Sequence, residues 1–210
     1  MIECLMTGAN GTIARVEAPC PGCWINAVAP SEEELAWLEH EIGVLPEFVR
    51  SALDEEETSR IDYDEDARQI FVIVDYPVVD EDGTTVRTSL PLTYDTMPLT
   101  MIFLPEKGMF ATISILENEV VDDLKSGRVR NVDTRYRTRF LLQILLHISR
   151  RYQIDLRSVN RQFRENEREL RRSMRNEELI KMLGFEKSLV YFSTSLKALD
   201  TTIQRISYGR

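Results

Sequence analysis

Two cysteines at close spacing are the first residues in this sequence with the types and arrangement to do chemistry. Cys20-Pro21-Gly22-Cys23 has the C-x-x-C spacing of redox and zinc sites. A zinc site needs four ligands, however, and the other soft ligands, Cys4, His40 and His147, follow no recognisable spacing. A thioredoxin-type site would begin a helix after its cysteines, whereas a strand is predicted after Cys23. We therefore expect a turn that carries a buried thiol.

An acidic stretch, residues 54–66, could bind a hard cation. Asp62-x-Asp64-x-Asp66 has the opening spacing of an EF-hand loop, but Ala67 stands where the turn needs glycine and Ile73 where it needs a bidentate glutamate. A dedicated calcium loop is therefore not expected. Because Mg²⁺ accepts one or two carboxylates plus water, two interpretations remain, weak magnesium binding and a solvated acidic surface.

A cluster of arginines could bind nucleic acid. Glu165, Glu167 and Glu169 are interleaved with them, however, and the chain has a net charge of −9. We expect a helix whose charges pair with one another or with the acidic front of the chain, and no nucleic-acid partner. The nine arginines are Arg150, Arg151, Arg157, Arg161, Arg164, Arg168, Arg171, Arg172 and Arg175.

Catalytic residues are scarce. His40 and His147 are the only histidines, and neither lies near a Ser or Cys nucleophile pattern. Glycine-rich motifs that bind nucleotide phosphates are absent from the sequence. His147 lies within an apolar helical run, so we expect a histidine in the core. The sequence predicts that the protein is not an enzyme.

Charge is divided unevenly along the chain. Residues 1–130 hold 26 acidic and 9 basic side chains, whereas residues 131–210 hold 9 acidic and 17 basic ones. No apolar run reaches the roughly 18–20 residues of a membrane helix, and the first residues lack the pattern of a signal peptide. We therefore expect a soluble, cytosolic chain.

The front of the chain alternates between predicted strands and helices. Ser31 and Glu34 form a capping box at the start of a helix that ends at Gly43, and Pro46 begins a second short helix. Residues 70–74 are continuously apolar, as in a strand buried on both faces. Further strands are expected at 12–17, 23–28, 86–93, 99–104 and 109–115, and a further helix at 118–125.

The back of the chain predicts two long helices. No Gly or Pro occurs between residues 128 and 183, where apolar residues recur every three or four positions. Asn176 can cap a second helix, so a turn near Arg175 would produce an antiparallel hairpin. The second helix carries a heptad seam made of Phe185, Leu189, Phe192, Leu196, Leu199, Ile203 and Ile206.

These elements predict an α/β fold of mixed α+β character. A helix-flanked mixed β-sheet in an αβα arrangement would occupy residues 1–130. The long C-terminal antiparallel helical hairpin, residues 131–210, would pack on it to form one structural unit.

Several segments, in their order and spacing, resemble the cytoplasmic domain of CorA-type magnesium transporters. The resemblance covers nearly the whole chain, and the last segment is the most specific. The segments are Cys23-Trp24-Ile25-Asn26, the Pro30-Ser31-Glu32-Glu33-Glu34 helix start, Gly43-Val44-Leu45-Pro46, Leu53-Asp54-Glu55, Met97–Ile102, Thr112-Ile113-Ser114 and Glu186–Lys197.

The resemblance implies a regulatory domain on the cytoplasmic face of the cell membrane. In the family, a stalk helix and two membrane spans follow this domain, and five subunits form the channel. We therefore expect a fragment that does not conduct ions by itself, whose partners are its own missing stalk and transmembrane segments. The complete protein would be a pentamer and the fragment a monomer or dimer. The alternatives are a soluble helical-hairpin interaction module and the domain of a related zinc transporter.

The resemblance also implies a regulatory metal site. The family senses cytoplasmic magnesium through an aspartate on the short helix after the Gly-x-x-Pro element, and that position is Ser51 here. A further acid of the family falls near His147. Since serine is a poor ligand, Asp54 and Glu57 are the nearest substitutes. We expect the protein to bind Mg²⁺ weakly, as a regulatory ion, and to hold no tightly bound cofactor.

Overall fold

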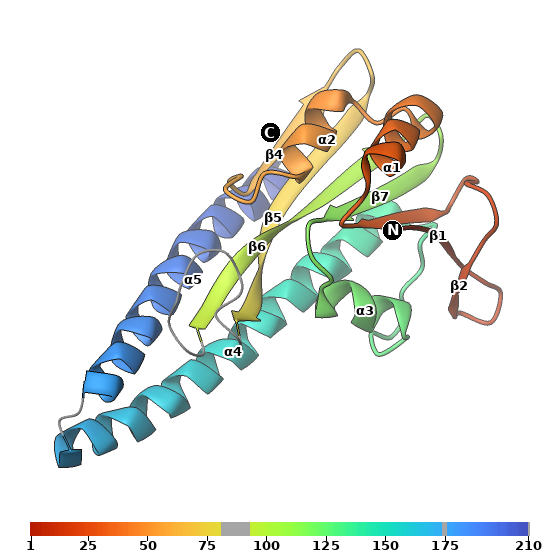
Figure 1. Ribbon diagram of the computed structural model, residues 1–210. Helices are drawn as coiled ribbons and strands as arrows, with labels where there is room; N and C mark the ends of the chain where they lie inside the picture. Colours follow the sequence, from red (N-terminus) through yellow and green to blue (C-terminus); the bar gives the residue numbers. More distant parts are fainter. Residues whose placement is uncertain (81–92, 174–175, 210) are drawn as a thin grey trace.

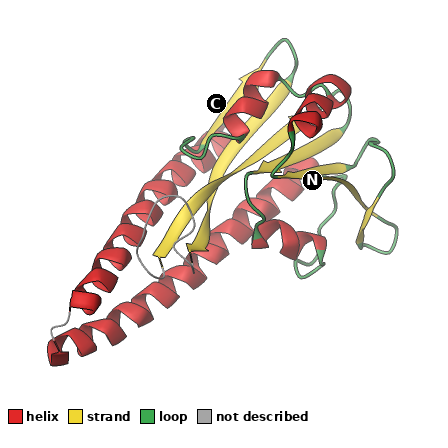
Figure 2. Cartoon of the chain, viewed as in Figure 1, coloured by secondary structure: helices red, strands yellow, loops and turns green. Residues whose placement is uncertain are grey.

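A seven-stranded mixed sheet lies at the centre of the computed structural model, which describes residues 1–80, 93–173 and 176–209. The strands, drawn in yellow in Figure 2, follow the order β2-β1-β3-β7-β6-β5-β4 in the sheet. Only the β3–β7 pair is parallel within the described sheet. The strands are β1 (Ile2–Thr7), β2 (Ile13–Arg15), β3 (Trp24–Val28), β4 (Arg60–Asp64), β5 (Gln69–Asp80), β6 (Thr93–Leu104) and β7 (Met109–Ser114).

Short helices cover one face of the sheet. They are α1 (Glu32–Trp37), a π-helical turn η1 (Leu38–Ile42) and α2 (Pro46–Ala52). The predicted capping box is present, because Ser31 accepts a hydrogen bond from the Glu34 backbone and Glu34 accepts one from the Ser31 backbone. Gly43 ends the turn with a φ of 76°, as expected for a left-handed C-cap. These elements bury Leu38 and other apolar side chains against the sheet.

The long helices α4 (Arg137–Ser173) and α5 (Asn176–Tyr208), with the short helix α3 (Glu119–Lys125), cover the opposite face (Figure 1). Phe140 of α4 joins the hairpin to the sheet, since its ring centroid lies 4.9 Å from that of Trp24 and 5.3 Å from that of Phe110. Helices on both faces of a mixed sheet make three layers. The predicted fold class is therefore confirmed. None of the described helices combines the length and apolarity needed to cross a bilayer.

The buried line of α5 differs from the predicted seam. Phe185, Phe192 and Leu199 are buried as expected, but Leu189 is 42% exposed and Leu196 and Ile203 are only partly buried. The positions between the buried apolar residues are instead filled by the small polar residues Ser188, Ser195 and Thr202. The Ser188 hydroxyl accepts a hydrogen bond from the backbone of Tyr94, and the Ser195 hydroxyl donates one to Asp75, because these residues face the sheet rather than another helix.

Several strands of the structure also differ from the predicted ones. Strands β1 and β4 were not predicted, and residues 60–64 of the acidic stretch form the edge strand β4. The predicted strand at 86–93, except Thr93, and the predicted turn at Arg175 lie outside the described residues. The strand at 70–74 is confirmed within β5, where residues 71–74 are fully buried.

Candidate functional site

The predicted metal residues follow helix α2 in the chain. Ser51 lies in the last turn of α2, and Asp54 and Glu57 lie in the loop between α2 and β4. The exposed Asp54 carboxylate accepts a hydrogen bond from the backbone of Glu56 at 2.9 Å, so it stabilises its own turn. Glu57 forms an ion pair with Arg60. The structure therefore brings Glu57, but not Asp54, into a charged cluster.

Arg60 of β4 is the centre of that cluster. Its guanidinium donates to the Ser51 hydroxyl at 3.2 Å and to the Asp62 carboxylate at 2.5 Å, and it lies 5.1 Å from the centroid of the Phe71 ring. Burial alone would lower the pKa of Arg60, but Asp62 and Glu57 raise it above its ordinary value. The arginine is a permanent cation in this cluster.

A metal ion at this place would have to compete with Arg60. Within the described part of the chain, no group of three or more His, Cys, Asp or Glu side chains has an arrangement that could hold a metal. The residues present fit a single-carboxylate contact with hydrated Mg²⁺ rather than a dedicated cage, because Mg²⁺ keeps several of its waters. A small cavity of about 280 Å³ lies beside Arg60, between α2 and β4.

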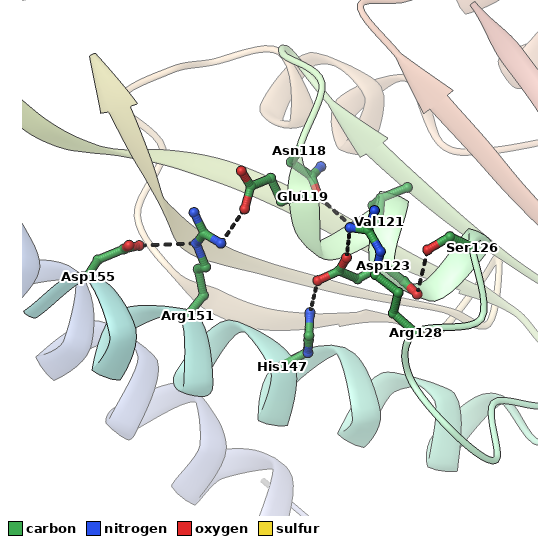
Figure 3. Close-up of polar contacts among 9 residues, drawn as sticks. All are labelled: Asn118, Glu119, Val121, Asp123, Ser126, Arg128, His147, Arg151 and Asp155. Atoms are coloured by element: carbon green, nitrogen blue, oxygen red, sulfur yellow. Dashed lines mark hydrogen bonds and ion pairs between the residues drawn. The ribbon is translucent and has the colours of Figure 1, made fainter. Parts of the chain in front are cut away.

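A second polar cluster joins α3 to α4 (Figure 3). The His147 ring nitrogen Nε2 lies 2.9 Å from the Asp123 carboxylate, which also accepts a hydrogen bond from Arg128 at 2.6 Å. Burial alone would raise the pKa of Asp123, but Arg128 and His147 lower it below its ordinary value. His147 is thus a partly exposed partner of a carboxylate, and the prediction of a core histidine is wrong. Helix α3 contributes an acid here that the apolar pattern of α4 did not reveal.

The same interface holds a buried carboxylate. Arg151 of α4 forms ion pairs with Glu119 of α3 and, at 3.3 Å, with Asp155 one helical turn away (Figure 3). Asp155 is only 4% exposed. Burial raises the pKa of Asp155, and Arg151 opposes this effect without cancelling it. Arg151 therefore forms ion pairs with two carboxylates, those of Glu119 and Asp155.

The charges on α4 were expected to pair with one another or with the acidic residues 1–130. In the structure Arg151 does, whereas the side chains that the structure describes include no ion-pair partner for the exposed Arg150, Arg157, Arg161, Arg164 and Arg168. The expectation is not met at these five positions, because the acid-rich segments around α1 and α2 lie on the opposite face of the sheet.

The cysteine motif forms a turn, as predicted. The Cys23 backbone donates to the Cys20 carbonyl at 3.0 Å, and Gly22 adopts a φ of 87°. The Cys23 side chain is fully buried and shares a hydrogen bond with Cys4 of β1. Burial raises the pKa of the Cys23 thiol to about 11, so it is a neutral thiol at physiological pH. The strand pairing of β1 with β3, which the sequence did not predict, brings Cys4 to this position.

The sequence matches a family model over most of its length. The model describes a CorA-like Mg²⁺ transporter protein and matches residues 22–210. The chain belongs to the CorA family. This match confirms the resemblance, and it includes the sheet from β3 onward and both long helices.

Individual CorA proteins agree with the family match. The cobalt/magnesium transport protein CorA of Methanocaldococcus jannaschii is 29% identical over 185 residues, which cover 83% of this chain and 52% of that protein. The chain therefore spans about half the length of this relative. The structure of the complete CorA magnesium transporter from the same organism has a TM-score of 0.77 at 25% identity, and the match covers 95% of this chain and 60% of that one.

Two solved domains share the fold of this chain. The soluble domain of M. jannaschii CorA has a TM-score of 0.80 at 23% identity, covering 98% of this chain and 78% of that one. The ZntB cytoplasmic domain of Vibrio parahaemolyticus has a TM-score of 0.69 at 12% identity, covering 97% and 78%. At these identities the two matches show the fold alone.

Proposed function

We propose that the chain is the cytoplasmic regulatory domain of a CorA-family magnesium, or divalent-cation, transporter and does not conduct ions by itself. The match to the CorA-like family model over residues 22–210 is the observation that carries this proposal. Its fold, shared with the soluble domain of M. jannaschii CorA, supports the same conclusion. The partners would be the stalk and transmembrane segments of the complete protein, in a pentameric assembly, and no catalytic activity is involved.

Regulation would act through carboxylates near α2. Bare carboxylates repel one another across a subunit interface, and a bound Mg²⁺ would offset this repulsion. Asp54 is exposed, and its Oδ1 atom is engaged only by a backbone N–H, so it can contact a hydrated ion. Glu57 would contribute only when it leaves Arg60, which makes the expected affinity weak.

Thermal unfolding of the 210-residue chain during a Mg²⁺ titration tests this proposal. At a Mg²⁺ concentration ten times the dissociation constant, linkage stabilises the folded chain by about 1.4 kcal/mol, which raises Tm by about 3 to 5 °C. We expect Asp54→Ala and Glu57→Ala to reduce this rise. Arg60→Gln should enlarge it, because it removes the competing cation.

Matched controls separate site binding from general screening. Glu56→Ala removes an exposed carboxylate from the same loop and should leave the rise unchanged. Sodium chloride at equal ionic strength should not reproduce it. If Tm stays constant up to millimolar Mg²⁺ in the wild type and in Asp54→Ala, the sensing role is lost. A larger rise with Zn²⁺ than with Mg²⁺ would favour the alternative that the chain is the domain of a related zinc transporter.

A further inference from the structure

All three cysteines of the chain lie close together beside strands β1 and β3. Cys20 and Cys23 are separated by a two-residue turn, and Cys4 of β1 contacts Cys23. All three are free thiols. The Cys20 thiol donates a hydrogen bond to the Met6 sulfur at 3.9 Å, and the Cys23 thiol shares one with Cys4. The proposed magnesium role uses none of these side chains.

The turn holds Cys20 and Cys23 at the separation that a disulfide needs. The Cys23 backbone N–H donates to the Cys20 carbonyl at 3.0 Å, and Gly22 has a φ of 87°, as at the third position of a type II β-turn. The outer Cα atoms of such a turn lie less than about 7 Å apart, and disulfides usually join Cα atoms about 4.4 to 6.8 Å apart. The backbone N–H of Cys20 also donates to the Cys23 sulfur. A disulfide therefore requires only that the Cys20 side chain turn from Met6 toward Cys23.

Cys4 is a poorer disulfide partner, although its thiol contacts Cys23. In the antiparallel pairing of β1 with β3, Cys4 lies opposite Ile25, so Cys23 is its diagonal neighbour. Diagonal neighbours lie about 7 to 8 Å apart, beyond the usual range for a disulfide. A soft metal ion is no better an occupant, because the three thiols, like every other such group among the described residues, lack an arrangement that could hold one. Cys20 and Cys23 are therefore the pair suited to thiol chemistry.

The two thiols of the pair differ in access to solvent. Cys20 is partly exposed, whereas Cys23 is fully buried. We propose that Cys20 and Cys23 are a reversible oxidation site, in which a peroxide oxidises Cys20 and Cys23 then closes a disulfide with it. Cys20 is the attacking residue because a small oxidant can reach it, and Cys23 is the resolving residue because it lies beside Cys20 and away from solvent.

The oxidation takes two steps. First, the Cys20 thiolate attacks one peroxide oxygen and the O–O bond breaks; Cys20 becomes a sulfenic acid, and the other oxygen leaves with the proton that the thiol released, as water or an alcohol. Second, the Cys23 sulfur attacks the Cys20 sulfur, the S–S bond forms and the S–O bond breaks, and the oxygen leaves with the Cys23 proton as water. The two sulfurs together lose two electrons, which reduce the peroxide.

The contacts around the pair favour the reduced form. Disulfide formation breaks the hydrogen bond of Cys20 with Met6 and that of Cys23 with Cys4. The partly exposed Cys20 sulfur is also open to attack by an incoming thiol. We therefore expect ordinary thiol reductants to restore the two thiols.

The turn lies where the sheet meets the hairpin. The Gly22 backbone donates to the Gly108 carbonyl at 2.8 Å, and a Cβ atom on Gly22 would lie 3.1 Å from the side chain of Arg135. Trp24, directly after Cys23, packs against Phe140 of α4. Oxidation would thus act at a contact between the sheet and α4.

Peptide mapping of the 210-residue chain after treatment with hydrogen peroxide tests the proposal. Trypsin cleaves after Arg15 and Arg50, so it separates Cys4, in residues 1–15, from Cys20 and Cys23, in residues 16–50. After alkylation of the remaining thiols, we expect peptide 16–50 to lack two hydrogens and to carry no alkyl group, while peptide 1–15 is alkylated. Dithiothreitol should make both thiols of peptide 16–50 available for alkylation again.

Variants assign the role of each thiol. Cys20→Ser removes the attacking residue and should slow the peroxide-driven loss of the Cys23 thiol about ten-fold or more. In Cys23→Ala the sulfenic acid on Cys20 has no resolving partner, so dimedone should label it. Cys4→Ser is the matched control, because it removes the third thiol and should leave disulfide formation within peptide 16–50 unchanged.

Three results would overturn the proposal. The first is that Cys20 and Cys23 remain open to alkylation after peroxide treatment. The second is a disulfide that joins peptide 1–15 to peptide 16–50, and the third is oxidation of Cys20 to a sulfinic acid that dithiothreitol does not reverse. None of these measurements involves Mg²⁺, so the result is independent of the sensing proposal.

Discussion

The pKa values of two carboxylates in this protein are shifted in opposite directions, because the carboxylates differ in burial and in the number of cations that each one contacts. Asp123 accepts from Arg128 and contacts His147, and together they lower its pKa although burial raises it. Asp155 is more deeply buried and shares its single cation, Arg151, with Glu119, so its pKa is raised. The two carboxylates lie on the same α3–α4 interface (Figure 3).

Replacing Asp123 should produce a pH-dependent loss of stability. A carboxylate with a lowered folded-state pKa stabilises the fold at pH values above its ordinary pKa of about 3.9, and this contribution is lost as the pH falls below that range. We expect Asp123→Asn to lower the free energy of unfolding by about 1 to 2 kcal/mol at pH 7, and by less near pH 3. Urea denaturation at both pH values measures the difference.

Two comparisons control this experiment. Asp122→Asn removes an exposed carboxylate from the same helix turn and should change stability little at either pH. Asp155→Asn should show the opposite slope, because a raised pKa destabilises the charged form and the wild type loses stability as the pH rises above about 4. Parallel slopes for Asp123→Asn and Asp155→Asn would contradict the assignment of the two carboxylates.

At the scale of single elements, helix ends follow local sequence closely. Ser31 and Glu34 begin α1 with a capping box, Asn118 caps α3, and Gly43 ends η1 in the left-handed conformation. Which residues of the long helices are buried depends instead on tertiary contacts. Helix α5 packs on strands, and its heptad pattern located the buried Phe185, Phe192 and Leu199. The pattern placed Leu189 in the seam although it is exposed, and it missed the small polar residues that contact the sheet.

Loss of the α1 cap should be measurable because the cap also joins α1 to the first strand. Glu34 accepts hydrogen bonds from the backbone of Ser31 and from the backbone of Ile2 in β1. We expect Ser31→Ala to reduce the free energy of unfolding by about 1 kcal/mol, as measured by chemical denaturation. Ser31→Thr keeps the hydroxyl and should cost less than half as much; equal losses would show that the cap is not the cause.

At the scale of the whole molecule, one aromatic cluster connects the hairpin to the sheet. Trp24 of β3 and Phe110 of β7 contact Phe140 at the start of α4. All three side chains are fully buried. The predicted union of residues 1–130 and 131–210 into one structural unit depends on contacts of this kind.

Phe140→Ala should therefore destabilise both parts together. Removing a buried phenylalanine costs about 3 to 5 kcal/mol. We expect tryptophan fluorescence, which reports on the sheet, and far-ultraviolet circular dichroism, dominated by the hairpin, to show coincident transitions that both shift to lower denaturant. Tyr136→Ala, at a position 61% exposed, should leave both midpoints in place. Two separate transitions in the wild type would indicate two independent units.

The sequence by itself determined what depends on near neighbours in the chain. Periodicity and capping residues located the main elements, the αβα class and the long hairpin, and the order of motifs indicated the CorA family. These features are local, because hydrogen bonds at helix ends and the alternation of buried faces involve residues only a few positions apart.

Only the tertiary structure decided which distant charges meet. The pairing of β4 with β5 places Arg60 above Phe71, and the packing of α3 on α4 brings Asp123 to His147. The candidate Glu57 is thereby paired with a cation, while Asp54 stays exposed. Ion pairs between residues far apart in the chain produce no periodic pattern in the sequence, because they depend on how the helices pack on the sheet.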